Sequence, residues 1–364
     1  MSGASGQRDL PLPASYRPQN ASRWDHQPDP TALLREAQTW RDRHALRPAS
    51  ADRRRIHLLL VDVQRDFCLP EGSLFVAGRS GRAALEDTDR LARFLYRNLE
   101  NVTETTCTLD SHVPHQIFFP AFWEDAAGRP LEAHREITAA EVRDGEVRPD
   151  PRVADLLAGG DHEWLRREVL HYCERLEATG QYRLYLWPPH CLQAGDGHAL
   201  VGVIQEARLF HAYARGASAA LELKGSHPLT EHYSVFAPEV LRRHAPPPES
   251  AAREVALPAE RNVALVDRLL RSDALVVAGQ AASHCVRFSL DDLLRDAVGR
   301  DPDLAGRVYV LEDCMSPVVI ANPAGGTPLF DFSPQFQEAL ESWAALGVNI
   351  VRSTTSMIDW PGMV

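Results

Sequence analysis

The stretch Leu275-Val276-Val277-Ala278-Gly279-Gln280-Ala281-Ala282-Ser283-His284-Cys285-Val286 changes from a strand pattern to a helix pattern within a few residues. Residues 274–278 have the length and β-branched content of a buried parallel strand. Small residues follow, and apolar residues then recur at helical spacing over 286–294. The pattern predicts a strand, a tight turn and a helix that begins at Cys285. Unpaired N–H groups and the helix dipole favour a thiolate there, so Cys285 is a candidate nucleophile. The alternative is a small buried hydrophobic residue.

Composition limits the class of protein. The chain has 364 residues, 44% hydrophobic and 24% charged, as in globular proteins, and a net charge of −11 that argues against nucleic acid or an anionic membrane as a partner. It has no apolar run near the ~18 residues of a membrane span, and its polar, Pro-rich N-terminus lacks the core of a signal peptide. We therefore expect a cytoplasmic protein with reduced thiols. Apart from Cys285, the cysteines are interpreted as structural: Cys68, Cys107, Cys173, Cys191 and Cys314.

Strand and helix patterns alternate along the chain, which predicts a three-layer α/β/α fold with a mainly parallel, doubly wound sheet. Residues 1–50 are expected to form an N-terminal arm with one helix that starts after Asp29-Pro30. Residues 51–364 are expected to form one α/β domain with an insertion at about 120–180, in which 161–176 is the only clear helix. The strands are expected at 56–63, 102–109, 182–187, 218–223, 274–278, 307–311 and 348–352.

Three polar residues lie at or just after the ends of different strands of this sheet: Asp62, Lys224 and Cys285. The carboxyl ends of parallel strands meet at one edge, so these residues can approach one another despite their distance in sequence. A buried carboxylate at Asp62 would be costly without a partner or a task. A carboxylate can take the thiol proton and a lysine can hold the carboxylate, which suits acyl transfer through a thioester, as in amide hydrolysis.

A second group of residues has the chemistry of metal ligands. Asp110 and His112 follow the strand at 102–109, and His115 lies on the same loop. His190 follows Pro188-Pro189, which makes a rigid turn. Carboxylate and imidazole are common ligands of Zn, Fe and Mn, so the pattern favours a divalent metal over an ordinary polar loop.

In their order and approximate spacing over about residues 55–355, these motifs resemble the isochorismatase-like cysteine hydrolases, and among them the nicotinamidases. The resemblance implies an isochorismatase-like fold with Asp62 as general base, Lys224 as its electrostatic partner and Cys285 as nucleophile. It also implies an oxyanion hole from the backbone N–H groups of Ala281 and Cys285, beside a cis peptide between Gln280 and Ala281. The motifs that carry it are 61–68 with 72–74, 110–112, 187–191, 224–225 and 279–286.

The same resemblance implies a metal held by Asp110, His112 and His190, which in nicotinamidases binds the pyridine nitrogen. Phe67 and Trp187 would line the aromatic pocket. No organic cofactor is implied, and relatives are commonly dimers or larger, so we expect a homo-oligomer.

The chain also departs from the family pattern. His115 is closer to His112 than the second loop histidine usually is, and Ala282 and Ser283 replace the usual threonine and acidic residue. The loop 226–234 adds two histidines, interpreted as exposed.

Three hypotheses follow for the function. The first is a metal-dependent nicotinamidase that converts nicotinamide and water to nicotinic acid and ammonia. The second is a related cysteine hydrolase of another small amide, carbamoyl or ureide compound, which the insertion and the altered loops favour. The third is a non-catalytic binding or assembly protein on the same fold. The isochorismatase reaction itself is disfavoured, since it does not need the nucleophilic cysteine.

Overall fold

The computed structural model describes residues 9–179, 182–256, 260–322 and 325–363. Two compact units form: residues 110–198 and 223–262 make the second unit, and the rest of the described chain makes the first. The first eight residues of the expected arm and residue 180 of the expected insertion lie outside the described residues. The helix expected after Asp29-Pro30 is present as α1 (Pro30–His44) and packs against α7 (Gly202–Arg215) within the first unit.

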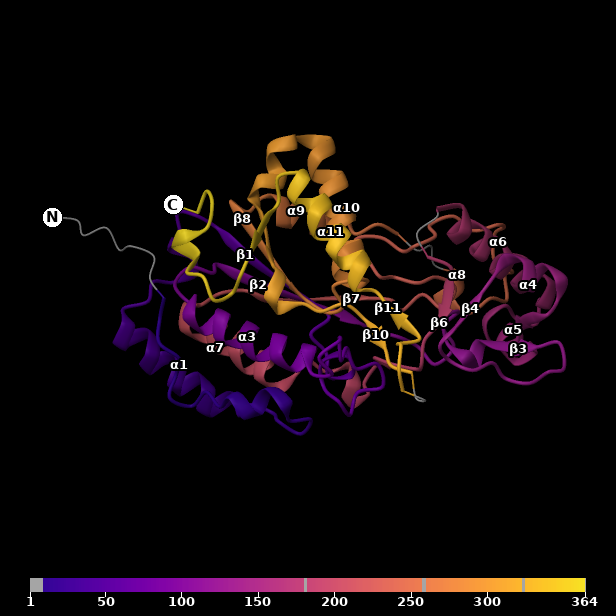
Figure 1. Cartoon of the computed structure of the whole chain (residues 1–364), viewed down its shortest axis with the longest axis horizontal. Coiled ribbons are helices and arrows are strands. Elements are labelled where there is room, and N and C mark those ends of the chain that lie inside the picture. The colour runs from indigo at the N-terminus through magenta and orange to yellow at the C-terminus, as the bar shows by residue number, and fades with distance from the viewer. Residues whose placement is uncertain (1–8, 180–181, 257–259, 323–324, 364) are drawn as a thin grey trace. The chain divides into compact units, whose positions relative to one another are not determined.

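The first unit is built on a six-stranded sheet with the order β12-β9-β8-β1-β2-β7 (Figure 1). The pairs β12–β9, β9–β8, β8–β1 and β1–β2 are parallel, which confirms the expected parallel sheet. The strands are β1 (Ile56–Val61), β2 (Glu104–Asp110), β7 (Ala219–Lys224), β8 (Ala274–Gly279), β9 (Val308–Leu311) and β12 (Asn349–Val351).

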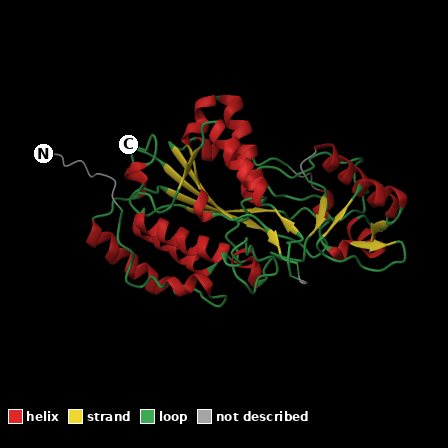
Figure 2. Cartoon of the chain, viewed as in Figure 1, coloured by secondary structure: helices red, strands yellow, loops and turns green. Residues whose placement is uncertain are grey.

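Helices cover both faces of this sheet, which confirms the three-layer α/β/α arrangement (Figures 1 and 2). Helices α1, α3 and α7 lie on one face, and α9, α10 and α11 lie on the other. The bounds of those not yet given are α3 (Ala83–Arg97), α9 (Val263–Leu270), α10 (Cys285–Arg300) and α11 (Ser333–Ala345). The remaining short elements of the unit are α2 (Arg65–Cys68), β10 (Val319–Ile320) and β11 (Phe330–Asp331).

The strand, turn and helix predicted around Cys285 are all present. Every residue of β1 and β8 is buried, as the unbroken apolar runs require of central strands. At the end of β8, Gly279 has φ +127°, and a Cβ there would lie 2.0 Å from the carbonyl oxygen of Val61. Only glycine lets the chain turn this close to β1. Helix α10 then starts at Cys285, the residue that the sequence predicts.

The second unit contains more helix than the sequence predicts. The expected helix at 161–176 is α6 (His162–Thr179), but α4 (Ala139–Asp144) and α5 (Pro151–Leu157) are present as well. Both are short and start at local caps: a capping box of Thr138 and Glu141 begins α4, and Asp150 caps α5. The unit also has α8 (Arg253–Ala256) and the antiparallel pairs β3 (Trp123–Asp125) with β5 (Val147–Pro149) and β4 (Arg135–Ile137) with β6 (Leu184–Leu186).

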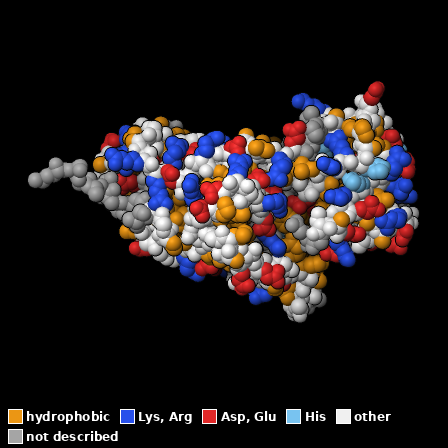
Figure 3. Space-filling view, turned by 90° about the horizontal axis from the view of Figure 1, so that it is seen from above, with side chains coloured by type: hydrophobic (Ala, Val, Ile, Leu, Met, Phe, Trp, Pro, Cys, Tyr) orange, Lys and Arg blue, Asp and Glu red, His pale blue; other side chains and the backbone are white. Residues whose placement is uncertain are grey.

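The charged side chains on the surface and the hydropathy of the helices are consistent with the composition of the sequence. On the face drawn in Figure 3, acidic and basic side chains are interspersed. None of the helices within the described ranges combines the length and the apolar character that a membrane crossing requires.

Candidate functional site

Asp62 and Cys285 lie close together in the first unit. Asp62 directly follows β1, and Cys285 is the first residue of α10. Because β1 and β8 pair in parallel, with Val61 opposite Gly279, the two chains leave the sheet at the same edge. A carboxylate oxygen of Asp62 and the Sγ atom of Cys285 lie within 4.8 Å of each other. The expected approach of these two strand ends is therefore present.

Thr108 orients the Asp62 carboxylate. The backbone N–H of Asp62 donates to Thr108 Oγ1 (3.0 Å), and that hydroxyl donates to Asp62 Oδ1 (2.5 Å). Asp62 has φ +46°, a left-handed conformation that is uncommon for a residue other than glycine and often found at functional sites. The sequence does not single out Thr108, because threonine is an ordinary residue in a strand.

The turn between β8 and α10 contains the cis peptide expected between Gln280 and Ala281. Ala282 N–H donates to the carbonyl of Ser316 (2.8 Å), and His284 N–H donates to the carbonyl of Ala281 (3.0 Å). The N–H of Ala281 has no acceptor among the residues that the structure describes. This amide is thus available for an oxyanion.

The other cysteines agree with their structural interpretation. None of the six cysteines forms a disulfide, and all six are buried. Burial raises the pKa of the Cys107 thiol to about 12 and raises the pKa values of Cys68, Cys173 and Cys314 further. These four thiols therefore stay protonated at neutral pH, which makes them poor nucleophiles.

Lys224 is paired with Asp110 in the second unit. Its Nζ donates to Asp110 Oδ1 (2.6 Å) and to the carbonyl of His232 (2.8 Å). Burial alone would raise the pKa of Asp110, but the Lys224 ammonium and His112 outweigh it and hold that pKa below its usual value. Asp62 and Cys285 belong to the first unit and Lys224 to the second, so the role of Lys224 in a triad stays a prediction.

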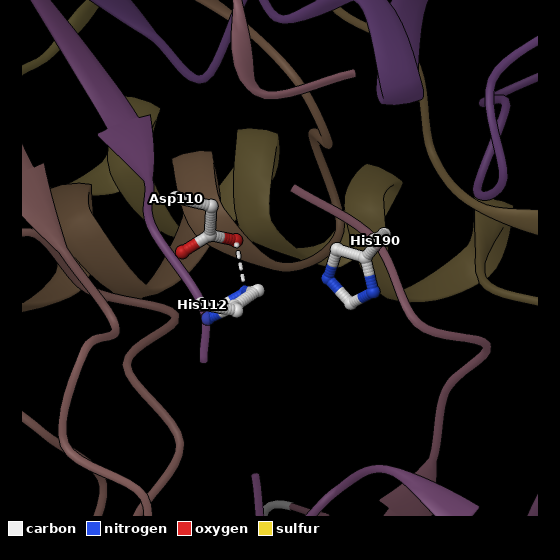
Figure 4. A group of neighbouring side chains, drawn as sticks. All are labelled: Asp110, His112 and His190. Atoms are coloured by element: carbon white, nitrogen blue, oxygen red, sulfur yellow. Dashed lines mark ion pairs between the residues drawn. The ribbon is translucent and has the colours of Figure 1, made fainter. Parts of the chain in front are cut away.

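Asp110, His112 and His190 form the expected cluster of metal-ligand types (Figure 4). All three are buried, and one ligand atom of each lies within 4.8 Å of the other two. His112 Nδ1 lies 2.9 Å from the carbonyl of Gly225, and His190 Nδ1 lies 2.8 Å from the carbonyl of Pro188. Because a carbonyl only accepts, each Nδ1 carries the proton and each Nε2 of a neutral ring presents a lone pair. This is the usual arrangement of metal-binding histidines.

The contact between His112 and Asp110 also fits a metal. His112 Nε2 lies 3.4 Å from Asp110 Oδ2, and Figure 4 shows this contact as a dashed line. With the ring proton on Nδ1, two acceptors face each other, so a cation or a second proton is needed between them. The other carboxylate oxygen is occupied by Lys224. Ligand atoms about 2.0–2.2 Å from a metal are roughly 3–4 Å apart, as His112 Nε2 and Asp110 Oδ2 are.

Gly225 and Gln116 support the His112 ring. Gly225 has φ +82°, and a Cβ there would lie 2.6 Å from His112 Cε1 and 3.0 Å from Asp110 Oδ1. The Gly225 carbonyl also accepts from Gln116 Nε2 (2.6 Å). Gly225 belongs to the motif at residues 224–225, but nothing in the sequence around Gln116 distinguishes Gln116 from an ordinary loop residue.

Aromatic rings surround the two histidines. The ring centroids of Phe118 and Phe119 lie 4.9 and 5.7 Å from that of His112, and Phe119 lies 5.5 Å from His190. Trp187 is buried, and its backbone N–H donates to the carbonyl of Phe118 (2.9 Å). Phe67 is buried in α2 of the first unit, so a pocket shared by Phe67 and Trp187 stays a prediction.

Two expectations need correction. His115 does not belong to any cluster of metal-ligand side chains in the described part of the chain, because the loop bends at residues 114–115, beyond His112. The loop 226–234 is not exposed as a whole: Glu231 and Ser234 are buried, and His232 Nε2 is buried without a partner among the described residues. Burial, followed by the Lys224 charge, lowers the pKa of His232 to about 3.

No protein-family model matches the chain, and no curated protein matches it. Among solved structures, it is similar to the yeast nicotinamidase bound to the inhibitor nicotinaldehyde, with 17% identity and a TM-score of 0.48 over 82% of this chain and 99% of that chain. It is also similar to the Acinetobacter baumanii nicotinamidase/pyrazinamidase, with 18% identity and a TM-score of 0.46 over 83% of this chain and 97% of the other.

A third similar structure is the pyrazinamidase of Pyrococcus horikoshii in complex with zinc, with 18% identity and a TM-score of 0.40 over 82% of this chain and 98% of that chain.

Proposed function

We propose that this protein is a metal-containing cysteine amidohydrolase with nicotinamide as its substrate. The observation that carries the proposal is the approach of the Asp62 carboxylate to the Cys285 thiol, within 4.8 Å, at the first turn of α10. A carboxylate beside a thiol at a helix N-terminus is an arrangement that generates a thiolate.

Each residue has a separate role in the proposed hydrolysis. Asp62 takes the proton from Cys285 Sγ, and the thiolate attacks the carbonyl carbon of the amide. The oxyanion accepts hydrogen bonds from the N–H groups of Ala281 and Cys285. Asp62 then gives the proton to the leaving nitrogen, ammonia departs and a thioester remains. Water attacks the thioester while Asp62 accepts its proton, the acid is released, and the proton returns to Sγ.

Lys224 would hold its neighbouring carboxylates in the ionised form, in line with its contact to Asp110 (2.6 Å). Asp110, His112 and His190 would hold the metal through Oδ2 and the two Nε2 atoms. A divalent metal such as Zn, Fe or Mn supplies a Lewis acid that can bind a basic ring nitrogen of the substrate.

The aromatic residues beside this cluster support a flat aromatic amide as substrate. Phe118 and Phe119 pack against the histidine rings, and Trp187 is linked to Phe118. A second candidate, a hydrolase of another small amide, carbamoyl or ureide compound, is favoured by the contact of α6 with the buried loop 226–234. That contact links the inserted segment to Trp187 through Glu231 and Tyr233.

The test measures ammonia release from nicotinamide by purified protein, together with its metal content by mass spectrometry. We expect release that is lost in Cys285→Ala and after chelation, and restored by adding the metal back. Cys107→Ala, which removes another buried thiol of the first unit, should retain activity.

Other outcomes separate the alternatives. If nicotinamide is not hydrolysed but Cys285 reacts rapidly with iodoacetamide, the substrate is another small amide. A Cys285 that is no more reactive than Cys107, together with no hydrolysis, would contradict the enzymatic proposal and favour a binding or assembly protein.

A further inference from the structure

A hydrogen-bonded chain in the second unit links the indole of Trp187 to a buried carboxylate. Trp187 Nε1 donates to the hydroxyl of Tyr233 (2.9 Å), and that hydroxyl donates to Glu231 Oε1 (2.7 Å). The hydroxyl of Tyr172, on helix α6, donates to Glu231 Oε2 (2.9 Å) and accepts from the backbone N–H of Glu231 (3.0 Å). Both carboxylate oxygens of Glu231 are therefore held by tyrosine hydroxyls.

The direction of each hydrogen bond is fixed. The indole N–H of Trp187 and the backbone N–H of Glu231 can only donate. Each tyrosine hydroxyl accepts one of these protons and must turn its own hydrogen toward Glu231. Only an ionised carboxylate, which accepts at both oxygens, satisfies this pattern completely.

Glu231 has no cationic partner among the residues that the structure describes. It is buried, and within the described residues no lysine, arginine or histidine forms an ion pair with it. The ionisable groups that interact with it are Tyr172 and Cys173 on α6 and Tyr233 on its own segment, none of which is cationic. Burial raises the pKa of Glu231 to about 7, although the hydrogen bonds from Tyr233 and Tyr172 lower it. The network therefore changes protonation near neutral pH.

Trp187 connects this network to the candidate metal site. Its backbone N–H donates to the carbonyl of Phe118 (2.9 Å), whose ring packs on His112. The next residue, Pro188, accepts the Nδ1 proton of His190 (2.8 Å). A shift of the Trp187 indole would thus be transmitted to Phe118, which packs on His112, and to the turn that holds His190.

We propose that Glu231 is a positioning residue that fixes the indole of Trp187 through Tyr233 and attaches helix α6 to the same wall through Tyr172. The inference rests on the proposed function only in taking Trp187 as part of the substrate pocket. In this arrangement, the inserted helix contributes to substrate selectivity without contacting the reacting atoms.

The test follows the indole N–H signal of Trp187 by NMR in the full chain labelled with ¹⁵N-tryptophan, with the signal identified by Trp187→Phe. We expect this signal to move between pH 5 and 9 with a midpoint near 7 in the wild type. It should not titrate in Glu231→Gln, since the amide keeps the size of the side chain but does not ionise. Tyr233→Phe should shift the signal at every pH. Tyr172→Phe should move the midpoint, which keeps the proposal testable if Glu231→Gln fails to fold.

Kinetics give a second readout. Loss of the hydroxyl in Tyr233→Phe should raise the KM for nicotinamide about three- to tenfold and leave kcat nearly unchanged, because one positioning hydrogen bond is removed. Tyr185→Phe is the matched control, because the Tyr185 ring packs against Trp187 (4.4 Å between centroids) but its hydroxyl contacts His134 instead. It should leave both the signal and KM unchanged.

The NMR titration needs no substrate, so the two proposals can fail separately. A Trp187 signal that does not titrate in the wild type, or titrates equally in Glu231→Gln, overturns the positioning role. A signal that titrates as expected in a protein that does not hydrolyse nicotinamide supports the positioning role and removes only the proposed substrate.

Discussion

Gly225 shows how a single backbone position determines the geometry of the metal ligands. Its carbonyl fixes the tautomer of His112, and the missing side chain leaves room for the His112 ring and the Asp110 carboxylate. A methyl group there would lie 2.6 Å from His112 Cε1, closer than real contacts allow. Either the ring or the backbone would have to move.

We therefore expect Gly225→Ala to weaken metal binding about 10- to 100-fold, the usual effect of disturbing groups that orient metal ligands. The measurement is titration of metal-stripped protein with Zn²⁺. Gly216→Ala is the matched control: Gly216 also has a positive φ (+57°), but a Cβ there would meet nothing within 4 Å. Equal zinc affinities in the two variants would contradict this account of Gly225.

At the scale of elements, helix α3 supports the turn that carries the expected oxyanion hole. The buried carboxylate of Asp87 accepts from Gln280 Nε2 (2.8 Å) and Ser316 Oγ (2.6 Å). Arg90 donates to its other oxygen (2.7 Å). Burial raises the pKa of Asp87, although these hydrogen bonds lower it. The side chain that precedes Ala281 is thereby held to a helix on one face of the sheet.

Asp87→Ala should leave the amide of Gln280 without this acceptor. We expect about 1–3 kcal/mol less free energy of unfolding and about a tenfold lower kcat with KM within about twofold, since the oxyanion donors act mainly in the transition state. Urea unfolding and steady-state kinetics measure these effects. Asp89→Ala, on the same helix but paired with Arg93, should lower stability without this change in kcat. If Asp87→Ala lowers only the free energy of unfolding and leaves kcat unchanged, the role of Asp87 is confined to folding.

Elements with long apolar patterns were predictable, and those with local or tertiary causes were not. The unbroken apolar runs of β1 and β8 are enough to predict central parallel strands, and the small residues after β8 predict the turn before Cys285. Helices α4 and α5 are too short for a periodic pattern and depend on caps at Thr138 and Asp150. Thr108, Gln116 and Asp87 act through hydrogen bonds to residues distant in sequence, which no spacing in the sequence records.

At the scale of the whole molecule, the chain passes between its two units at the ends of β2 and β7, just where Asp110 and Lys224 lie. The sequence predicts one continuous insertion, yet the second unit also includes residues 223–262. Contacts distant in sequence hold this segment in place, such as Ala252 N–H to the carbonyl of Leu157 (3.0 Å) and Tyr172 to Glu231. Hydrophobic periodicity reflects only contacts between residues near one another in sequence. The division of the chain into these two units was therefore not predictable.

The stability of the whole protein should depend on pH through a buried histidine that is not one of the candidate site residues. His211, on α7, is fully buried; its Nε2 donates to the carbonyl of Val102 (2.8 Å), and its Nδ1 has no partner among the described residues. Burial lowers the pKa of His211 to about 4, although the hydrogen bond to Val102 raises it. The unfolded chain therefore binds a proton near pH 6.5 that the folded protein does not bind until about pH 4. The stability from this group is present above pH 6.5 and is lost as pH falls.

From this difference we expect His211 to remove about 2 kcal/mol from the free energy of unfolding between pH 7 and pH 5. This effect is measured by urea unfolding of the wild type and His211→Gln at pH 7 and pH 5. Between these pH values the free energy of unfolding should fall by about 2 kcal/mol less in the variant than in the wild type, whatever the stability of the variant at pH 7. His162→Gln, at an exposed position of α6, is the control and should show the wild-type loss. If wild type and His211→Gln lose the same free energy, the acid sensitivity arises elsewhere. In that case the buried Nδ1 of His211 accepts a proton at little cost.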